Sequence, residues 1–501
     1  MADQQSSYRQ IFKSTGLFGG VQIITILINF IRTKFIAVFL GTAGVGMMGL
    51  LNAPVALIAS LTGLGISYSA IRDISEAAYA SDAKNLARTL ISFRRWVLFT
   101  GLLGMFITIL LSPWLSKWTF GNSNYTWAFI WLSVTLFLNA ISGGQRTFLQ
   151  GMRKLQSMAK ATVIGSLLGL FTSVPLYYYY GLQGIVPAMI ITAIVSLMLS
   201  WYFTKQVVVA KVTISYADSY AIGVSMLKLG ILISISAQIG ALVLYLMNSF
   251  IIRTGGMEQV GLYSAGMGLV GSYIGIVFTA MGMDYYPKLA AISKDNFRIK
   301  TMVNQQAIMS VLIISPFVLV LLTTMPIVIR LLLTKEFYEI IPFVNLTVLG
   351  VIIKAVGWTI GYISLAKGDS KVFFWLEGIL SNSLYFILSV AFYKFWGLNG
   401  IGIAFIANYI IYLIIVYQIA KKRYDFSFEK ELYIVMSISI LLSLLAFSSI
   451  IYFSSYSLYI ILVSLIVIGI SYSYYELNKR MNLKPIIISF INKLKKKDNN
   501  I

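Results

Sequence analysis

Two cations stand inside the first long apolar segment of this chain. Arg32 and Lys34 lie within residues 17–40, a stretch that is otherwise apolar, small or uncharged and contains no acidic residue. A charged side chain at bilayer depth costs roughly 2.5–3.5 kcal/mol on insertion scales, so it usually faces a watery cavity or another helix. Because no local acid pairs with these two cations, we expect them to serve a cavity that receives an anion.

The two cations differ in what they can reach. Arg32 lies about eight residues from the outer end of its segment, near mid-membrane. Its guanidinium can bind two phosphate oxygens at once; the alternative is an interhelical partner such as Asn52 or a backbone carbonyl. Lys34 lies about 200° further around a regular helix, so it either snorkels along lipid or stands where the helix is unwound. Asn29 shares the Arg32 face and could bond sugar hydroxyls or pack between helices.

Five more ionisable residues at or near predicted spans complete the candidate set. Lys354 lies deep in a later apolar segment and is the second-half candidate for the same cavity. Arg253 and Arg330 lie near outer helix ends, where they could draw a head group outward. Asp284 and Glu377 are the acids closest to spans. Either could carry a coupling proton, and the alternative for both is a structural salt bridge.

The composition is that of a membrane protein. Of 501 residues, 58% are hydrophobic and 11% charged, against about 25% charged in soluble domains, and apolar runs of about 20 residues recur along the chain. The net charge of +22 lies mainly in short loops, which orient membrane proteins, so no nucleic-acid partner is expected. Cys and His are absent, which removes disulfides and the commonest metal ligand and general base. No metal or cofactor is therefore expected.

The apolar runs predict fourteen spans and an all-α polytopic fold. The predicted helices cover residues 17–40, 46–68, 96–116, 126–146, 159–180, 183–204, 227–252, 259–283, 302–333, 340–365, 372–394, 398–420, 432–453 and 458–475. With this count, 31 of the 39 Lys and Arg residues fall on one side of the membrane. Positive charge collects in cytoplasmic loops, so both termini are predicted to be cytoplasmic.

The chain also contains a weak internal repeat. Residues 180–185 (YGLQGI) recur as 396–401 (WGLNGI) at an offset of 216, and Phe35, Gly41 and Gly46 match Phe250, Gly256 and Gly261 at 215. The offset spans six predicted helices, an even number, so both halves have the same orientation. Two parallel six-helix repeats around a central cavity are a known transporter architecture; shared loop composition is the alternative explanation. The predicted segments are lobes at 1–210 and 211–425, two additional helices at 426–480, and a basic cytoplasmic tail at 481–501.

Residues 31–51 (IRTKFIAVFLGTAGVGMMGLL) resemble the first two helices of polysaccharide flippases of the multidrug/oligosaccharidyl-lipid/polysaccharide exporter superfamily. The shared pattern is an Arg, an apolar stretch, Leu-Gly, a short turn, Gly-x-Gly and a second apolar helix. The turns at 180–185 and 396–401 resemble that family's short outer turns. The resemblance covers roughly residues 10–420.

The resemblance implies a function and a setting. Such proteins move an undecaprenyl-pyrophosphate-linked oligosaccharide from the cytoplasmic to the outer leaflet of the bacterial inner membrane, by alternating access around a cationic cavity. The O-antigen branch looks nearest, which implies a polysaccharide polymerase and chain-length machinery as partners beside the bilayer and the lipid-linked substrate. Fourteen helices, two more than is usual in that branch, resemble the lipid II flippases, so the branch stays open.

Two other functions compete with a polysaccharide flippase. A drug or cation exporter of the same superfamily would need an acid where the first helix here carries cations. A membrane glycosyltransferase or polymerase would need catalytic groups in a sizeable outer loop, and the largest predicted one, at 117–127, contains no acid. We therefore expect a transporter and not an enzyme.

Overall fold

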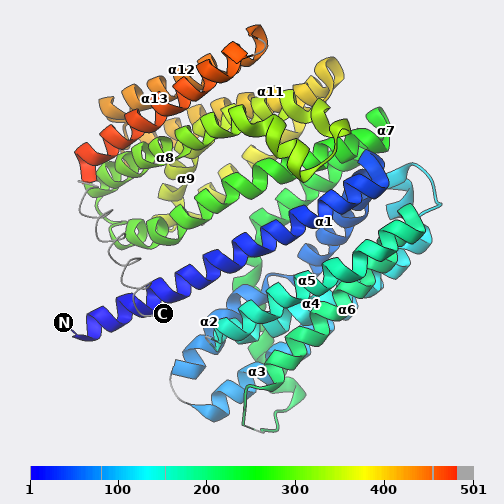
Figure 1. The fold of residues 1–501 in the computed structure, drawn as a ribbon. Helices are drawn as coiled ribbons and strands as arrows, with labels where there is room; N and C mark the ends of the chain where they lie inside the picture. Colours follow the sequence, from blue (N-terminus) through cyan, green and yellow to red (C-terminus); the bar gives the residue numbers. More distant parts are fainter. Residues whose placement is uncertain (1, 80–81, 153, 211, 454–455, 482–501) are drawn as a thin grey trace, which may run out of the picture. The chain divides into compact units, whose positions relative to one another are not determined.

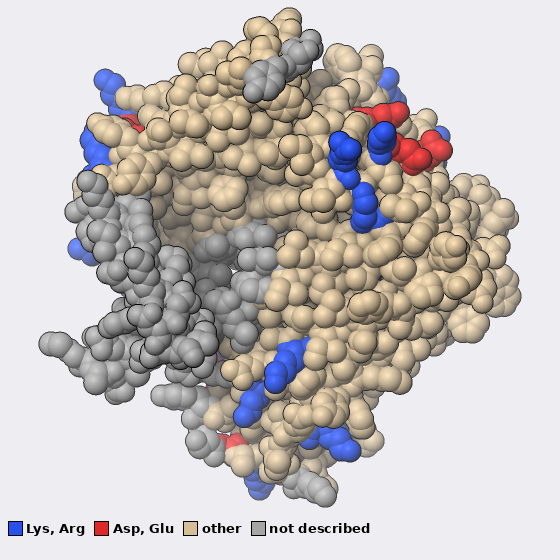
Figure 2. All heavy atoms as spheres, in the orientation of Figure 1, with Lys and Arg blue, Asp and Glu red and all other residues tan. Residues whose placement is uncertain are grey.

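The described part of the molecule is built from helices (Figure 1). The computed structural model describes residues 2–79, 82–152, 154–210, 212–453 and 456–481. Within these ranges no residue is in a strand, and ten helical stretches are long and apolar enough to cross a membrane. On the face drawn in Figure 2, uncharged side chains cover most of the described surface, and charged residues occur in small separate groups. The predicted all-α, multi-pass membrane architecture is confirmed.

The chain divides into two compact units. The first comprises Met1–Ala265 with Arg330–Phe337, and the second comprises Gly266–Ile329 with Tyr338–Ile501. The predicted lobes and the two additional helices stay predictions. The predicted basic tail lies, from residue 482 onward, outside the described residues.

The first unit is a bundle of membrane-length helices and one short helix. Its elements are α1 (Ala2–Gly63), α2 (Ile66–Tyr79), α3 (Ala83–Phe120), α4 (Thr126–Gly151), α5 (Leu155–Tyr180), the 3-10 turn η1 (Gly181–Gly184), α6 (Ile185–Lys205) and the first part of α7 (Tyr216–Ala291). Helix α4 packs against α3 and α6, α5 packs against α6 and α1, and α1 also contacts α3. The region enclosed by α1, α4, α5 and α6 carries the polar residues considered below.

Helices α1 and α7 pack backbone to backbone within the first unit. A side-chain carbon on Gly46 would overlap the carbonyl oxygen of Met257, and one on Gly261 would overlap that of Thr42. Small residues permit such close approach between helices in membranes, where van der Waals packing holds helices together. Gly46 and Gly261 are a matched pair of the sequence repeat, so equivalent positions of the two halves pack against each other.

The second unit contains the remainder of α7 and the helices that follow it. They are α8 (Asn296–Leu332, of which the part to Ile329 belongs here), η2 (Lys335–Ile340, from Tyr338 onward), α9 (Ile341–Ala366), α10 (Ser370–Phe373), the π-helical turn η3 (Phe374–Leu380), α11 (Ser381–Tyr424), α12 (Lys430–Tyr452) and α13 (Tyr456–Met481). Helix α9 packs against α11, α10 and α12, and α12 packs against α13. Asn304 ties α8 to the segment before α12 by donating to the Ser427 carbonyl at 3.0 Å.

Three long helices bend at a glycine. The bends lie at Gly41 in α1, Gly256 in α7 and Gly397 in α11. Each falls in a gap between two predicted spans, at 40–46, 252–259 and 394–398 respectively. Ten stretches qualify as spans by length and composition within the described residues, so the count of fourteen and the side of the termini stay predictions.

The two outer turns of the sequence repeat have the same backbone conformation. Gly181, after α5, has φ 56° and ψ −137°, and Gly397 in α11 has φ 56° and ψ −139°. A positive φ is readily adopted by glycine and disfavoured for residues with a Cβ. The nearly equal angles of Gly181 and Gly397 are what the predicted repeat requires of its two matched turns.

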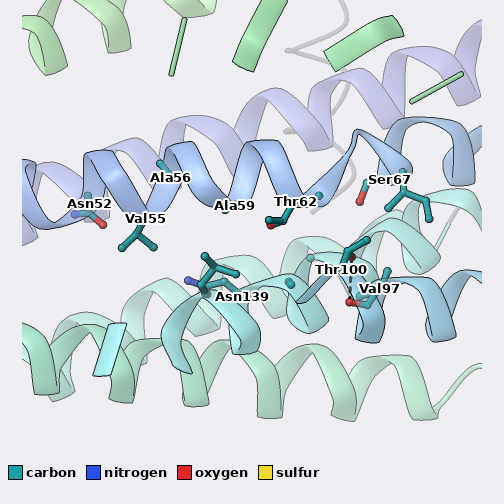
Figure 3. A pocket seen from close by; sticks show the side chains of 14 residues that line it. Asn52, Val55, Ala56, Ala59, Thr62, Ser67, Val97, Thr100 and Asn139 are labelled. Atoms are coloured by element: carbon teal, nitrogen blue, oxygen red, sulfur yellow. Dashed lines mark hydrogen bonds between the residues drawn. The ribbon is translucent and has the colours of Figure 1, made fainter. Parts of the chain in front are cut away.

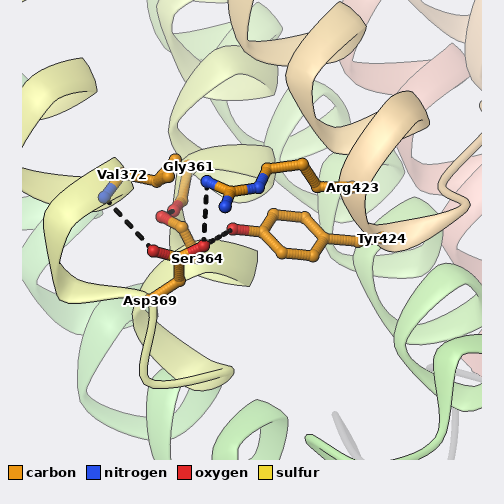
Figure 4. Close-up of polar contacts among 6 residues, drawn as sticks. All are labelled: Gly361, Ser364, Asp369, Val372, Arg423 and Tyr424. Atoms are coloured by element: carbon orange, nitrogen blue, oxygen red, sulfur yellow. Dashed lines mark hydrogen bonds and ion pairs between the residues drawn. The ribbon is translucent and has the colours of Figure 1, made fainter.

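A polar clasp closes the turn between α9 and α10 in the second unit (Figure 4). Asp369 accepts a hydrogen bond from the Tyr424 hydroxyl at 3.1 Å and forms a salt bridge with Arg423 at 3.2 Å. Its carboxylate also accepts the backbone N–H of Val372 at 3.4 Å, at the start of the new helix. The clasp joins the end of α11 to the α9–α10 turn.

The glycine contact between α1 and α7 is testable by adding one methyl group. Gly46→Ala should lower the thermal unfolding midpoint of the purified, detergent-solubilised protein, because overpacking against a rigid backbone costs about 1–3 kcal/mol. Gly268→Ala in α7 is the matched control, since no atom lies within 4 Å of its added carbon. Equal midpoints for the two variants would show that α1 and α7 do not pack this closely.

Candidate functional site

Arg32 reaches from α1 towards α5 and α6 inside the first unit. A side-chain carbon on Gly169 of α5 would lie 2.9 Å from Arg32 Nη2 and 3.4 Å from Thr192 Oγ1 of α6, so both groups surround the bare Gly169 backbone. The Arg32 Nε is buried and has no hydrogen-bond partner among the described residues. The buried Tyr177 on α5 is its electrostatic neighbour. The guanidinium thus occupies a polar site that supplies no negative charge.

The face of α6 in this region is a stripe of hydroxyl groups. Thr192, Ser196, Ser200 and Thr204 recur at every fourth position and so share one helix face; we call them the α6 hydroxyl stripe. The Ser173 hydroxyl of α5 lies 3.1 Å from that of Thr192, and the Ser200 hydroxyl donates to the Gln145 side chain of α4. The stripe therefore links α4, α5 and α6 through uncharged polar groups.

Arg146 of α4 is a second cation on this stripe. Its Nη1 donates to the hydroxyls of Ser142 at 3.0 Å and Ser196 at 3.2 Å. The predicted span 126–146 ends at Arg146, but α4 continues to Gly151 and keeps the side chain partly buried. The clue in the sequence was the polar Ser142 and Gln145 beside it, at the end of an apolar helix.

A cavity of about 370 Å³ lies between α1, α2, α3 and α4 in the first unit (Figure 3). Its wall carries the amides of Asn52 and Asn139, the hydroxyls of Thr62, Ser67 and Thr100, and otherwise small or apolar residues. No charged residue lines it. The lining therefore offers neutral hydrogen-bonding groups.

The side chains of Lys34 and Arg253 reach the carboxyl ends of other helices, where carbonyl groups lack intrahelical partners. The Lys34 ammonium donates to the carbonyls of Leu333 and, at 3.1 Å, Arg330, where α8 ends. Arg253 donates to the Trp118 carbonyl at 2.8 Å, in the last turn of α3. Cations at helix carboxyl ends are typically worth about 0.3–1 kcal/mol. Both contacts give these cations a local structural role.

The remaining cations and Asn29 lie in two settings. The side chains of Asn29 and Arg330 are exposed. In the second unit, the Lys354 ammonium of α9 lies 5.4, 5.8 and 5.3 Å from the ring centres of Phe278, Phe405 and Tyr409. Cation–π contacts of this kind are worth about 0.5–2 kcal/mol each. The rings stabilise the ammonium without an acid in direct contact.

Glu377 lies in the π-helical turn η3 of the second unit. Its carboxylate accepts a hydrogen bond from the Tyr412 hydroxyl of α11 and interacts electrostatically with Lys354. A side-chain carbon on Gly361 would lie 2.5 Å from Glu377 Oε1, so glycine leaves the room that this contact needs. Single π-helical turns often occur at functional sites. The side chain of Asp284 in α7 lies outside the described residues.

The predicted site residues fall into two groups. The first unit holds Arg32, Lys34, Asn29, Arg253 and Arg330, and the second holds Lys354, Glu377 and the backbone of Asp284. Within the second unit the structure brings Lys354 and Glu377 together. Among the described residues, no group of three or more His, Cys, Asp or Glu side chains could hold a metal ion.

Several solved transporters share this fold. An inward-facing multidrug resistance MATE family transporter of the MOP superfamily has a TM-score of 0.64 at 16% identity, over 81% of this chain and 94% of its own. The lipid II flippase MurJ, in an inward closed conformation, has a TM-score of 0.63 at 15% identity, over 93% and 99%. A mutant of the Vibrio cholerae MATE transporter VcmN has a TM-score of 0.57 at 16% identity, over 86% of this chain and 100% of its own.

The chain thus shares its fold with multi-pass transporters of the MOP superfamily. The chain belongs to the polysaccharide biosynthesis protein family, whose model matches residues 35–342. No curated protein sequence matches it. The family model confirms the predicted link to polysaccharide biosynthesis, and the fold is the one expected from the resemblance to transporters of this superfamily.

The observed position of the Arg32 guanidinium requires that residue 169 has no side chain. Gly169→Ala should lower transport about tenfold, equivalent to roughly 1.4 kcal/mol, because the added methyl displaces the guanidinium. Gly165→Ala, one turn earlier on α5, is the control, since its added carbon meets Leu199 at an ordinary 3.6 Å. Flipping rates in proteoliposomes measure both, and equal rates would show that the guanidinium is not held at Gly169.

Proposed function

We propose that this protein flips an undecaprenyl-pyrophosphate-linked oligosaccharide of the O-antigen type from the cytoplasmic to the outer leaflet of the bacterial inner membrane. Its family and transporter fold support a polysaccharide carrier. The observation that carries the anionic substrate is Arg32, a cation in a membrane-length helix with a buried Nε that has no partner within the described residues. A pyrophosphate offers paired oxygens that a guanidinium binds well.

Transport by this proposal is alternating access between two six-helix lobes, in a chain with fourteen spans and both termini in the cytoplasm. Arg32 binds the pyrophosphate from the first lobe, with Asn29 near the sugar. Lys354 contributes positive charge from the second lobe, where three aromatic rings contact its ammonium and the Glu377 carboxylate is its electrostatic neighbour. Lys34, Arg253 and Arg330 add positive potential near helix ends and draw the head group outward.

The substrate class also implies who supplies and consumes it. A lipid-linked oligosaccharide is assembled on the cytoplasmic face and is used on the outer face once it has been flipped. A polysaccharide polymerase and chain-length machinery are therefore the proposed partners, beside the bilayer itself. The comparisons support the transporter and its lipid setting rather than any one sugar.

A lipid II-type substrate is the second candidate. The MurJ likeness extends over 93% of this chain, against 81% for the first MATE transporter, so it extends over more of the fold. A drug or cation exporter is less favoured, because Arg32 and Lys354 would repel a cation. Parallel flipping assays with lipid II and an undecaprenyl-pyrophosphate oligosaccharide separate the two lipid substrates.

Removal of the Arg32 charge tests the anion hypothesis. Arg32→Ala should keep expression while lowering flipping of the undecaprenyl-pyrophosphate oligosaccharide at least tenfold, about 1.4 kcal/mol or more. Arg32→Lys should retain part of the activity, because the charge stays and the two-oxygen geometry is lost. Lys117→Ala, at an exposed position on α3, is the control. Normal flipping by Arg32→Ala would reject the hypothesis.

Glu377 is the proposed coupling residue in the second lobe, and Asp284 is the alternative. Glu377→Gln keeps an oxygen that can accept the Tyr412 hydrogen bond but cannot take up a proton. We expect this variant to bind substrate normally and to lose the stimulation of flipping by an imposed proton gradient. Glu431→Gln, exposed at the start of α12, is the control. If the proton gradient stimulates Glu377→Gln as much as the wild type, Glu377 is not the coupling residue. The role would then belong to Asp284, or flipping would not be coupled through either acid.

A further inference from the structure

Arg146 is a cation in a membrane-length helix, and within the described residues it forms no salt bridge with an acidic side chain. It lies in α4, a membrane-length helix, and is partly buried. Its printed partners are the hydroxyls of Ser142 and Ser196, and no salt bridge joins it to an acid within the described ranges. Hydroxyl groups accept hydrogen bonds but do not neutralise a charge. An ionisable residue inside a membrane helix is by default a candidate for function, because its burial is costly.

The two ends of the Arg146 guanidinium face different surroundings. Nη1 is anchored by the two hydroxyls of α4 and α6. Nη2 lies 4.0 Å from the place where a side-chain carbon of Gly143 would stand. Gly143 lines the 370 Å³ cavity between α1, α2, α3 and α4, whereas Arg146 itself is not among the lining residues. Gly143, which has no side chain, therefore lies between the cavity and Nη2.

The cavity supplies further donors along the same face of α4. Asn139 precedes Gly143 by four residues and Arg146 by seven, so the three share one helix face. Asn139 and Asn52 have exposed side chains in the cavity wall (Figure 3). The hydroxyl protons of Thr62 and Thr100 are engaged by the carbonyls of their own helices. The two amides, the Ser67 hydroxyl and Arg146 are therefore the groups able to donate to an incoming oxygen.

We propose that the cavity beside Arg146 is a second binding station for a phosphate-type oxyanion, separate from Arg32. Arg146 Nη2 binds the oxyanion, and the Asn139 and Asn52 amides bind its further oxygens or the adjoining hydroxyl groups. The inference rests on the proposed function, which supplies a pyrophosphate-bearing substrate. A head group of a lipid and free pyrophosphate share this chemistry.

The α6 hydroxyl stripe connects the new station to Arg32. Ser196, which anchors Arg146, lies one turn from Thr192, which adjoins Arg32 at Gly169. One helical turn advances about 5.4 Å. The two cations thus flank one continuous run of uncharged hydroxyl groups within a single unit. An oxyanion leaving Arg146 would meet these hydroxyls before it reaches Arg32.

Binding by the purified full-length protein tests the station independently of transport. Thermal unfolding in neutral detergent is followed while inorganic pyrophosphate is titrated, with sodium chloride at matched ionic strength as the screening control. Nanodiscs with and without undecaprenyl pyrophosphate form the second arm, which distinguishes a lipid head group from the free anion. The variants are Arg146→Gln, Arg146→Lys, Gly143→Val and Arg32→Ala. Arg88→Gln, an exposed cation of α3, is the control.

The proposal expects a specific pattern. Wild type and Arg88→Gln should be stabilised by pyrophosphate or its lipid form, and chloride should not reproduce the effect. Arg146→Gln and Gly143→Val should weaken the apparent affinity at least tenfold, the second without any loss of charge. Arg146→Lys should lose less than Arg146→Gln. Loss in Gly143→Val is not expected if Arg146 only ties α4 to α6.

Other outcomes overturn one or both hypotheses. If Arg32→Ala abolishes binding while Arg146→Gln and Gly143→Val bind normally, the second station is rejected and the proposed function stands. If Arg32→Ala binds normally and the other two do not, the station stands and the role of Arg32 is rejected. No stabilisation of the wild type in either arm, or equal stabilisation by chloride, rejects both.

Discussion

The constraint behind this structure is that a bilayer provides no water for backbone N–H and C=O groups. Each group must find a partner within the protein, which restricts the spanning segments to helices. The described residues follow this rule and contain no strand. Helices can then turn only where the backbone tolerates an unusual conformation, and the bends at Gly41, Gly256 and Gly397 meet that requirement.

The same constraint sorts the cations by the partners open to them. Helix ends expose carbonyls, and Lys34 and Arg253 are stabilised by the ends of α8 and α3. Lys354 is stabilised by aromatic faces instead. Arg32 and Arg146 lie among hydroxyls and bare glycine backbone, which satisfy hydrogen bonds only in part and leave the charge uncompensated. A negatively charged substrate bound there would compensate these charges.

The matched positions of the two halves agree in packing and turn geometry but differ in their charged residues. The matched glycines Gly46 and Gly261 pack backbone to backbone, and the matched turns at Gly181 and Gly397 have nearly equal angles. The position of Arg32, however, corresponds in the second half to the region of Met247, which is fully buried and neutral. Packing and turn geometry constrain both halves alike, whereas a binding site does not need its charges at equivalent positions.

The sequence by itself determined the membrane class, the helical fold, the glycine turns and the suspicion about Arg32. Hydropathy, turn residues and a lone charge in an apolar run are local properties, and they can be seen along the chain without knowing what packs where. It also matched the glycines that later prove to touch, because close packing excludes every larger residue.

Tertiary structure decided the partners of each charge. Lys34 meets the Arg330 carbonyl 296 positions further along the chain, and no periodicity in either segment indicates that contact. Arg146 stood at the end of a predicted span, whereas in the structure α4 extends past it and α6 supplies Ser196 as its partner. The cavity likewise depends on where residues of four helices meet. The environment of a charge is set by distant segments, so the sequence could propose the cations but could not separate those with a partner from those without one.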